Sequence, residues 1–285
     1  MQLYVVDAFT TQRFSGNQAG VALLSPGEDF PAGEVMRALA GELKHSETVF
    51  VKPLEGGGFH LRYFTPAGEV DLCGHATVAA FTALRERAGL ACGEYPVRTL
   101  AGDISIGVAE GSVWMDMAAP KVLRRFEPEE LPALYAAYGL TVADKPGGLS
   151  PAVVSTGLAD ILLPVTSAAL DRAVQDRAEV LRLSEHYDVV GFHLFCPDGE
   201  HTARCRNFAP RYDIDEEAAT GTSNGALTWL LYEAGRIKEG EENSFLQGQA
   251  MGKPSLIRSR LTLEEGKPRI RVGGPAVVNL KLELL

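Results

Sequence analysis

The order of hydrophobic and polar residues predicts a chain in which short strands alternate with a few helices. Apolar side chains recur every three or four positions over residues 32–43, which is the spacing of an amphipathic helix. Short apolar runs bounded by glycine-rich turns are typical of strands. Such runs cover residues 3–8, 20–24, 47–52, 58–64, 96–100, 104–109, 112–117, 152–155, 159–165, 188–195, 203–208, 255–261, 269–272 and 277–284. Further helices are predicted at residues 129–138 and 167–183.

Two other predicted helices carry small apolar residues on every face. They cover residues 75–88, followed by Gly89, and residues 222–234, followed by Gly235. A helix that is apolar all round is expected in a core, and a glycine after it is a common C-terminal stop. The sequence therefore predicts two buried helices, one in each half of the chain.

The segments before these two helices resemble each other. Tyr63-Phe64-Thr65-Pro66 ends eight residues before Gly74, which opens the first helix. Asn207-Phe208-Ala209-Pro210 ends eleven residues before Gly221, which opens the second. We interpret the match as a duplicated domain with pseudo-twofold symmetry. The alternative is that β-rich domains with Phe-x-Pro turns simply look alike.

A phenylalanine upstream extends the match. Phe50 lies 14 residues before Phe64, and Phe195 lies 13 residues before Phe208. The Ala-Ala-Pro sequence that ends at Pro120 is the best candidate for a boundary. We predict domains at residues 1–118 and 119–285, with the last strand able to cross back to the first domain.

Each glycine-led helix start has a chemical consequence. Glycine lets a ligand approach the backbone closely, and the first N–H groups of a helix have no partner within it. If the two halves face each other, two helix N-termini converge on one cleft. Such a cleft suits a carboxylate, or an enolate that forms during a reaction.

Composition excludes several functions. The 285 residues are 46% hydrophobic and carry a net charge of −10, without a cluster of Lys or Arg. A nucleic-acid partner and an anionic membrane surface are therefore not expected. No apolar run reaches the roughly 20 residues of a spanning helix, and residues 1–7 lack the features of a signal peptide, so we expect a cytoplasmic protein. Four scattered cysteines are too few for a disulfide framework, and we expect reduced thiols.

Several motifs occur in an order that is typical of one family. They are Phe14-Ser15-Gly16-Asn17, His45-Ser46-Glu47-Thr48-Val49-Phe50, Tyr63-Phe64-Thr65-Pro66, Glu69-Val70-Asp71-Leu72-Cys73-Gly74-His75-Ala76-Thr77, Ile214-Asp215-Glu216-Glu217-Ala218-Ala219-Thr220-Gly221-Thr222, Gln247-Gly248 and Met251-Gly252-Lys253-Pro254-Ser255. Together they resemble the PhzF-like phenazine-biosynthesis isomerases, which have the diaminopimelate epimerase-like fold. The resemblance implies an α+β protein of two pseudo-symmetric domains, each a curved, mostly antiparallel sheet or barrel around a central helix. It also implies a homodimer that needs no metal and no organic cofactor.

The resemblance further implies which residues act. Glu47 would shuttle a proton between carbons of a small carboxylate substrate, assisted by His75 and Glu217. The candidate substrate-binding residues are Asn17, Ser46, Gly74, Gly221 and Thr222. This chain has Glu217-Ala218 where the family usually has Asp followed by Pro, and Gln18 where the family usually has Pro. The longer Glu217 side chain puts in doubt that the substrate is the one used by the phenazine enzymes.

The residues themselves support acid–base chemistry. A carboxylate at Glu47, beside an apolar strand, becomes a general base if burial raises its pKa; the alternative is an exposed glutamate at a strand edge. The helix start disfavours the charged form of His75, although a histidine there can also be bonded only locally. Glu217 can equally belong to a solvated acidic turn. The repeat aligns Glu47 with Phe192, so we predict one base acting on one face of the substrate.

The cysteines argue against two other mechanisms. The repeat places Cys73 opposite Thr220, so a mechanism with two facing thiols lacks its second thiol. A Cys73–His75 hydrolase has no evident third, orienting group. We interpret Cys73 as a small buried residue. A zinc site is suggested only superficially by the spacing of His193, Cys196, His201 and Cys205, because strand alternation puts the first two on opposite faces.

The sequence thus predicts a cofactor-independent isomerase or epimerase that moves a proton on a small carboxylate through an enol-type intermediate. One alternative is a two-base amino-acid racemase or epimerase. The other is a non-catalytic metabolite-binding or interaction protein on the same fold.

Overall fold

The computed structural model describes residues 1–284 and contains two compact units. The first comprises Met1–Asp116 together with the segment that begins at Gly273, and the second comprises Met117–Val272. The chain thus passes from the first unit to the second two residues before the predicted boundary at residue 118. The final strand belongs to the first unit, where it pairs with the first strand of the chain.

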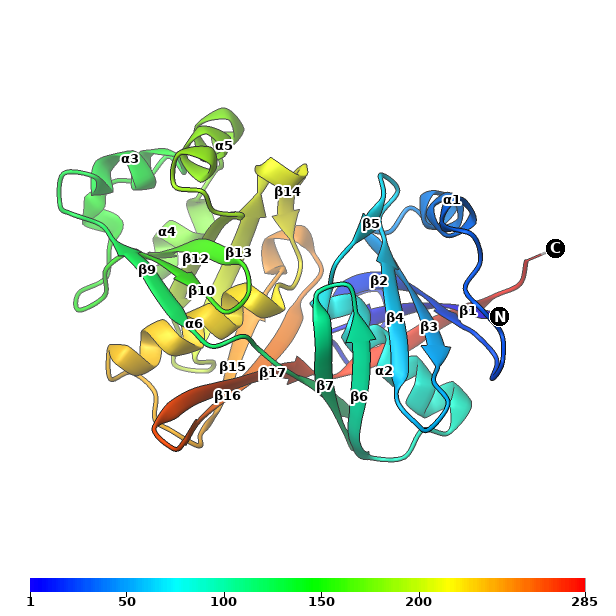
Figure 1. Ribbon diagram of the computed structural model, residues 1–285. Coiled ribbons are helices and arrows are strands. Elements are labelled where there is room, and N and C mark those ends of the chain that lie inside the picture. Colours follow the sequence, from blue (N-terminus) through cyan, green and yellow to red (C-terminus); the bar gives the residue numbers. More distant parts are fainter. Residues whose placement is uncertain (285) are drawn as a thin grey trace. The chain divides into compact units, whose positions relative to one another are not determined.

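The first unit is a curved sheet around one helix (Figure 1). Its elements are β1 (Gln2–Ala8), β2 (Asn17–Leu23), α1 (Gly33–Leu43), β3 (Glu47–Pro53), β4 (Phe59–Phe64), β5 (Glu69–Val70), α2 (Gly74–Ala88), β6 (Gly93–Thr99), β7 (Gly102–Ala109), β8 (Ser112–Asp116) and β18 (Ala276–Leu282). The strands pair in the order β18–β1–β2–β3–β4–β6–β7–β8. The β2–β3 and β4–β6 pairs are parallel and the others are antiparallel.

The second unit repeats this architecture. Its elements are β9 (Lys121–Arg125), α3 (Leu131–Ala136), β10 (Ala152–Ser155), β11 (Ala159–Pro164), α4 (Ser167–Arg172), α5 (Arg177–His186), β12 (Gly191–Pro197), β13 (Ala203–Ala209), β14 (Ile214–Glu217), α6 (Gly221–Glu233), β15 (Glu242–Gln247), β16 (Ser255–Glu264) and β17 (Lys267–Gly274). The strands pair in the order β9–β10–β11–β12–β13–β15–β16. The β11–β12 and β13–β15 pairs are parallel, at the same places in the order as in the first unit.

The pairing registers show that the two units are copies of one design. In the first unit the β1–β18 register shifts between Val5 and Val6. In the second the β10–β9 register shifts between Val153 and Val154, at the corresponding position. A bulge is a defined local feature of a strand, and two bulges at matching positions are difficult to explain without a duplication.

The two central helices explain why each sheet can close so tightly. Residues 75–84 of α2 are all buried, and α2 packs against β1, β2, β3, β8 and β18. In the second unit α6 packs against β10, β11 and β16. Gly225 of α6 is needed there, because a Cβ atom would lie 2.9 Å from Thr156 Oγ1 and 3.1 Å from Met117 Cγ. Small residues on all sides therefore allow the sheet to wrap around the helix, as the composition of both segments indicates.

Other helices cover the outer faces of the sheets. In the first unit Met36 and Ala40 of α1 pack with Phe50 and Phe64. In the second unit α3, α4 and α5 cover a larger apolar cluster that includes Phe192 of β12. Each unit consequently has two separate apolar layers, one on each face of its sheet.

The structure corrects the predicted helix at residues 167–183. The chain leaves helical geometry at Ala173, whose ψ is 126°, and a new helix starts after Asp176. The Asp176 carboxylate accepts a hydrogen bond from the Glu179 N–H, which is a standard N-terminal cap. The predicted strands also omit the short β5 and β14, and β9 and β15. Three of the five residues of β9 are charged, and β15 buries the polar side chains of Asn243 and Gln247, so neither shows apolar alternation. Among residues 1–284, no helix is both long and apolar enough to cross a membrane.

Candidate active site

Glu47 and His75 meet inside the first unit. Glu47 is the first residue of β3 and lies on the same strand face as Val49. That face points to α2, because Tyr63, the partner of Val49, shares a 2.7 Å hydrogen bond with Thr77 of α2. The Glu47 carboxylate is thereby directed to the start of α2, and its Oε2 atom lies 3.3 Å from His75 Nε2.

The His75 imidazole is almost completely enclosed. Its side chain is 4% exposed, and burial lowers its pKa, against the opposing charge of Glu47. Ser46 Oγ lies 3.4 Å from Nε2, and Cys73 Sγ lies 3.3 Å from Nδ1. Both ring nitrogens therefore have polar neighbours that can pass or accept a proton.

Glu47 stands between the buried histidine and solvent. Its side chain is 16% exposed. Its Oε2 atom is buried and accepts no hydrogen bond from residues 1–284, so the ion pair with His75 is the polar contact found for this atom. A partly exposed carboxylate next to a buried, neutral imidazole is an arrangement that can act as a general acid–base pair.

Cys73 corrects the sequence-based interpretation. It is half-buried and touches the His75 ring, whereas the sequence suggested a small residue of the core. Suitable donor atoms of Glu47, Cys73 and His75 all lie within 4.8 Å of one another, the one such group of His, Cys and acidic residues in the described part of the chain. We call these three residues the Glu–Cys–His group.

Two further candidates of the first unit lie beside this group. Asn17 opens β2, two residues before Ala19, which is the register partner of Glu47. Asn17, which is 9% exposed, thus lies on the same sheet face as Glu47. Gly74 is the first residue of α2, and the side chain of Cys73 before it makes no capping hydrogen bond.

Gly74 and Gly221 have no evident structural need to be glycine. A Cβ atom at Gly74 would lie 3.9 Å from Met115 Cε, and one at Gly221 would lie 3.8 Å from Val272 Cγ1, both ordinary contacts. Neither residue has a positive φ. Since neither backbone conformation nor packing within the chain requires glycine, the missing side chains leave space for something else at both helix starts.

In the second unit, Glu217 is tied to the start of α6. Glu217 ends β14, and its Oε2 accepts a 3.1 Å hydrogen bond from Thr220 Oγ1. Gln247 donates from Nε2 to the Glu217 carbonyl at 2.8 Å, and its Oε1 accepts from the Thr220 N–H at 3.3 Å. Gln247 is fully buried, so its side chain fixes the Glu217–Thr220 turn against β15. Gln247 is not among the site residues predicted from the sequence, although the Gln247-Gly248 motif is a signal for it.

A second hydrogen bond holds the first turn of α6 in place. Thr156 Oγ1 donates to the Thr222 carbonyl at 2.8 Å, and the Thr220 side chain makes no capping hydrogen bond. Glu217, Gly221 and Thr222 are thus neighbours within the second unit. That the two glycine-led helices face one cleft stays a prediction.

The strand registers correct the position that matches Glu47. Thr48 pairs with the phenylalanine that ends β4, and Phe192 pairs with the matching phenylalanine of β13. Thr48 therefore corresponds to Phe192, and Glu47 corresponds to Gly191, one residue away from the prediction. A one-residue slip moves a side chain to the other face of the sheet. Phe192 indeed belongs to the outer apolar cluster.

Gly191 also shows why this position of the second unit carries no acid. A Cβ atom there would lie 1.9 Å from the carbonyl oxygen of Phe208, closer than any real contact. The second unit therefore has no acidic residue at the position matching Glu47, and the reason is steric: a side chain does not fit there.

The second unit instead contains a buried polar network beneath α6. Ser223 Oγ donates to Asp160 Oδ2 at 2.6 Å, and Asn207 Nδ2 donates to Ser223 Oγ at 3.2 Å. Asn207 Nδ2 also lies 3.3 Å from His193 Nδ1. Burial raises the pKa of Asp160 to about 6, partly offset by the Ser223 hydrogen bond, and burial lowers the pKa of His193 to about 4. This network could not be predicted from the sequence, because isolated polar residues in apolar strands give no periodic signal.

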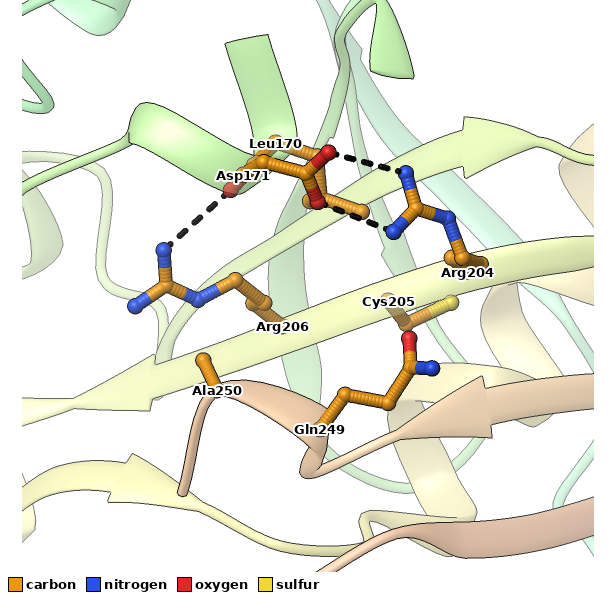
Figure 2. A pocket seen from close by; sticks show the side chains of 7 residues that line it. All are labelled: Leu170, Asp171, Arg204, Cys205, Arg206, Gln249 and Ala250. Carbon is orange, nitrogen blue, oxygen red and sulfur yellow. Dashed lines mark hydrogen bonds and ion pairs between the residues drawn. The ribbon is translucent and has the colours of Figure 1, made fainter. Parts of the chain in front are cut away.

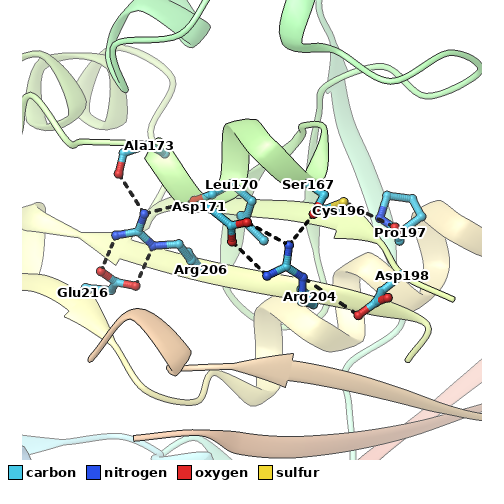
Figure 3. Close-up of polar contacts among 10 residues, drawn as sticks. All are labelled: Ser167, Leu170, Asp171, Ala173, Cys196, Pro197, Asp198, Arg204, Arg206 and Glu216. Atoms are coloured by element: carbon cyan, nitrogen blue, oxygen red, sulfur yellow. Dashed lines mark hydrogen bonds and ion pairs between the residues drawn. The ribbon is translucent and has the colours of Figure 1, made fainter. Parts of the chain in front are cut away.

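A pocket of about 270 Å³ in the second unit contains none of the predicted site residues. It is lined by Leu170, Asp171, Arg204, Cys205, Arg206, Gln249 and Ala250 (Figure 2). Arg204 bonds Asp171 and Ser167, and Arg206 forms a bidentate pair with Glu216 (Figure 3). Since both guanidinium groups already have carboxylate partners, the pocket offers little uncompensated charge to an anion.

Comparison with known proteins agrees with this architecture. The family model of phenazine biosynthesis-like proteins, PhzC-PhzF, matches residues 6–281. An uncharacterized isomerase of Deinococcus radiodurans is 38% identical over 96% of this chain and 91% of its own length. The crystal structure of a PhzF-family phenazine biosynthesis protein from Bacillus anthracis superposes with a TM-score of 0.87 at 28% identity, covering 100% of this chain and 99% of the other.

A more distant structure supports the fold alone. A hydroxyproline epimerase from Agrobacterium vitis superposes with a TM-score of 0.63 at 16% identity, covering 99% of this chain and 91% of the other. The predicted diaminopimelate epimerase-like fold and the predicted enzyme class, isomerase, are confirmed. The chain belongs to the PhzC-PhzF family of phenazine biosynthesis-like proteins.

Proposed function

We propose that this protein is a cofactor-independent isomerase or epimerase that moves a proton on a small carboxylate substrate. Glu47 is the general acid–base, and His75 assists it. The observation that carries the proposal is the 3.3 Å contact between the partly exposed Glu47 carboxylate and the buried His75 imidazole at the open start of α2.

The proposed reaction begins at Glu47. Its carboxylate removes a proton from a carbon next to an electron-withdrawing group, and the electron pair of the broken C–H bond moves into an enol-type system. The protonated Glu47 then returns the proton to another carbon, or to the same carbon, of that system. Because the same group gives back what it took, the enzyme ends in its starting state and no external acid, base or oxidant is consumed.

His75 supports this cycle as a neutral group. Its lowered pKa keeps the imidazole uncharged near neutral pH, so it does not hold Glu47 in a strong ion pair that would weaken it as a base. A neutral imidazole can donate one hydrogen bond to Glu47 or to the developing enolate and accept another. The Ser46 hydroxyl, 3.4 Å from Nε2, can orient the ring.

Helix starts are the proposed binding groups for the substrate anion. The space at Gly74 and Gly221 and the absence of a capping bond from the preceding side chains favour an acceptor from a ligand over one from the chain. We assign Asn17, Ser46 and Gly74 of the first unit and Gly221 and Thr222 of the second as substrate-binding residues. Glu217, held by Thr220 and Gln247, is the second acidic participant.

Solvent exchange tests the proposal. Wild-type protein is incubated in heavy water with a panel of small cyclic and acyclic carboxylates, and deuterium uptake at carbon is measured by NMR and mass spectrometry. We expect exchange with at least one compound, and a loss of about 100-fold or more in Glu47→Gln, within the range that general acid–base groups contribute. Glu55→Gln, at an exposed glutamate of the β3–β4 turn, is the matched control.

Two outcomes would contradict the proposal. Full exchange by Glu47→Gln would remove Glu47 as the base. Binding of a carboxylate by the wild type with no exchange of any carbon-bound hydrogen would favour a metabolite-binding protein on this fold.

A further inference from the structure

We propose that the Glu–Cys–His group is a binding site for a thiophilic divalent cation of the Zn²⁺ type, and that the bound cation blocks the acid–base centre. The three side chains offer a carboxylate, a thiolate and an imidazole, which are the three ligand types that Zn²⁺ takes in proteins. They lie at the start of α2, within the first unit.

One donor atom from each of the three side chains lies within 4.8 Å of the other two, close enough for one metal ion to gather them. Cys73 Sγ lies 3.9 Å from His75 Nε2, and His75 Nε2 lies 3.3 Å from Glu47 Oε2. In a tetrahedral site with Zn–S of about 2.3 Å and Zn–N and Zn–O of about 2.0–2.1 Å, the corresponding ligand–ligand distances are about 3.5 Å and about 3.3 Å. The Glu47–His75 spacing matches a shared ion on Nε2, whereas Cys73 Sγ, which lies nearer Nδ1 at 3.3 Å, has to turn toward Nε2 to bind the same ion.

The surroundings favour a cation here. Glu47 Oε2 is buried, and the 3.3 Å contact with His75 Nε2 is the one polar contact found for it among residues 1–284, so a positive ion can stabilise this buried carboxylate oxygen. Glu47 and Cys73 are only partly buried, so an ion has a path from solvent. Three protein ligands leave the fourth tetrahedral position for water or for a carboxylate from a ligand.

The thiol sets the preference among cations. A soft sulfur ligand beside imidazole selects Zn²⁺ and similar ions over Mg²⁺ and Ca²⁺, which prefer oxygen ligands. Once bound, the ion takes the lone pairs of Glu47 and His75 that proton transfer requires. The blocking effect rests on the proposed function, whereas the binding site does not.

Direct metal binding tests the site without any substrate. Metal-free protein is titrated with Zn²⁺ by isothermal calorimetry, and with Co²⁺ by absorption, where a thiolate ligand gives a charge-transfer band. We expect one equivalent of either ion and the thiolate band. We expect affinity to fall at least about 10-fold in Cys73→Ser and in Glu47→Gln, since changes in the outer shell of a metal site already cost that much.

Cys92→Ser is the matched control. Cys92 is an exposed cysteine that bonds Arg85, away from the group, and its loss should leave both titrations unchanged. Melting followed by circular dichroism shows which variants are folded; if Cys73→Ser is not, Glu47→Gln carries the comparison. Absence of stoichiometric binding to the wild type overturns the site, and so does binding that Cys73→Ser and Glu47→Gln both retain at full affinity.

The exchange assay, repeated with one equivalent of Zn²⁺, separates the two proposals. Binding together with loss of exchange supports both. Binding with unchanged exchange overturns the blocking effect and places proton transfer elsewhere than the Glu–Cys–His group. Exchange that requires Glu47, without any metal binding, overturns the metal site and leaves the proposed function standing.

Discussion

Replacing Asp160 by asparagine should change how stability depends on pH. Asp160 is 2% exposed, and burial raises its pKa to about 6 from the ordinary value of 3.8. Between these two pH values the folded protein holds a proton on Asp160 that the unfolded chain has released. Because the native state then binds more protons than the unfolded state, stability falls as pH rises through this window.

The magnitude follows from the size of the shift. A difference of about 2.2 pKa units at about 1.36 kcal/mol per unit gives a penalty of about 3 kcal/mol, complete above pH 6 and absent below pH 4. Asp160→Asn keeps an acceptor for Ser223 and removes the charge. The stability of the variant relative to wild type should therefore increase by about 3 kcal/mol between pH 4 and pH 7.

His193 makes this comparison necessary. Its pKa is lowered to about 4 from 6.5, so the unfolded chain binds the additional proton and stability is lost as pH falls from 6.5 to 4. That slope is opposite to the slope of Asp160 and of similar size, at about 3.4 kcal/mol in full. In the wild type the pH dependences of stability from Asp160 and His193 oppose each other and largely cancel. Asp160→Asn removes the first, so the variant should show the pH dependence of His193 alone.

Urea denaturation from pH 4 to pH 7 measures the effect. Asp103→Asn, at an exposed carboxylate of β7, is the control and should follow wild type at every pH. A constant difference between Asp160→Asn and wild type across the range, whatever its sign, would refute the assignment of a raised pKa to Asp160.

Further predictions concern individual positions. Gly221→Ala should fold and melt like wild type, because its methyl group makes only an ordinary contact with Val272, but it should raise KM for the substrate that the exchange screen identifies; unchanged KM would remove this helix start from the binding site. Gly191→Ala should lose about 3 kcal/mol or more in urea denaturation through overlap with the Phe208 carbonyl, whereas Gly199→Ala, which meets nothing within 4 Å, should lose less than about 1 kcal/mol. Gln247→Leu should lose about 2–3 kcal/mol, because the Glu217 carbonyl and the Thr220 N–H lose their buried partner; a smaller loss would mean that water replaces the amide. Glu47→Gln, the variant of the exchange assay, should keep wild-type stability in urea denaturation within about 1 kcal/mol, since its contact with the neutral His75 imidazole is not a charge pair.

The sequence predicts the duplicated fold well because the repeat is carried by backbone requirements. Glycine-led helices of small residues and Phe-x-Pro turns are needed wherever a sheet wraps closely around a helix, so both copies keep them. The proposed roles of Glu47 and His75 come from the family motifs, and the structure places the two side chains 3.3 Å apart.

Register is predicted less well, for a physical reason. Matching Phe50 with Phe195 looks natural, but the pairing registers match Phe50 with Leu194. Phe195 is therefore on the inner face and Phe50 on the outer one, and side-chain likeness alone does not distinguish the two faces. Cys73 and the Asp160 network were misread or missed because contacts between side chains on different elements leave no trace in spacing.

The crowding at Gly191 limits how this protein can evolve. A duplicated fold begins with two equal copies, and a second acidic residue at the position matching Glu47 would be one substitution away if both positions could hold a side chain. Here the Phe208 carbonyl occupies that space, so a carboxylate at Gly191 requires the β12–β13 backbone to move first. Laboratory selection for a two-base racemase from this scaffold should accordingly find its second base at another position.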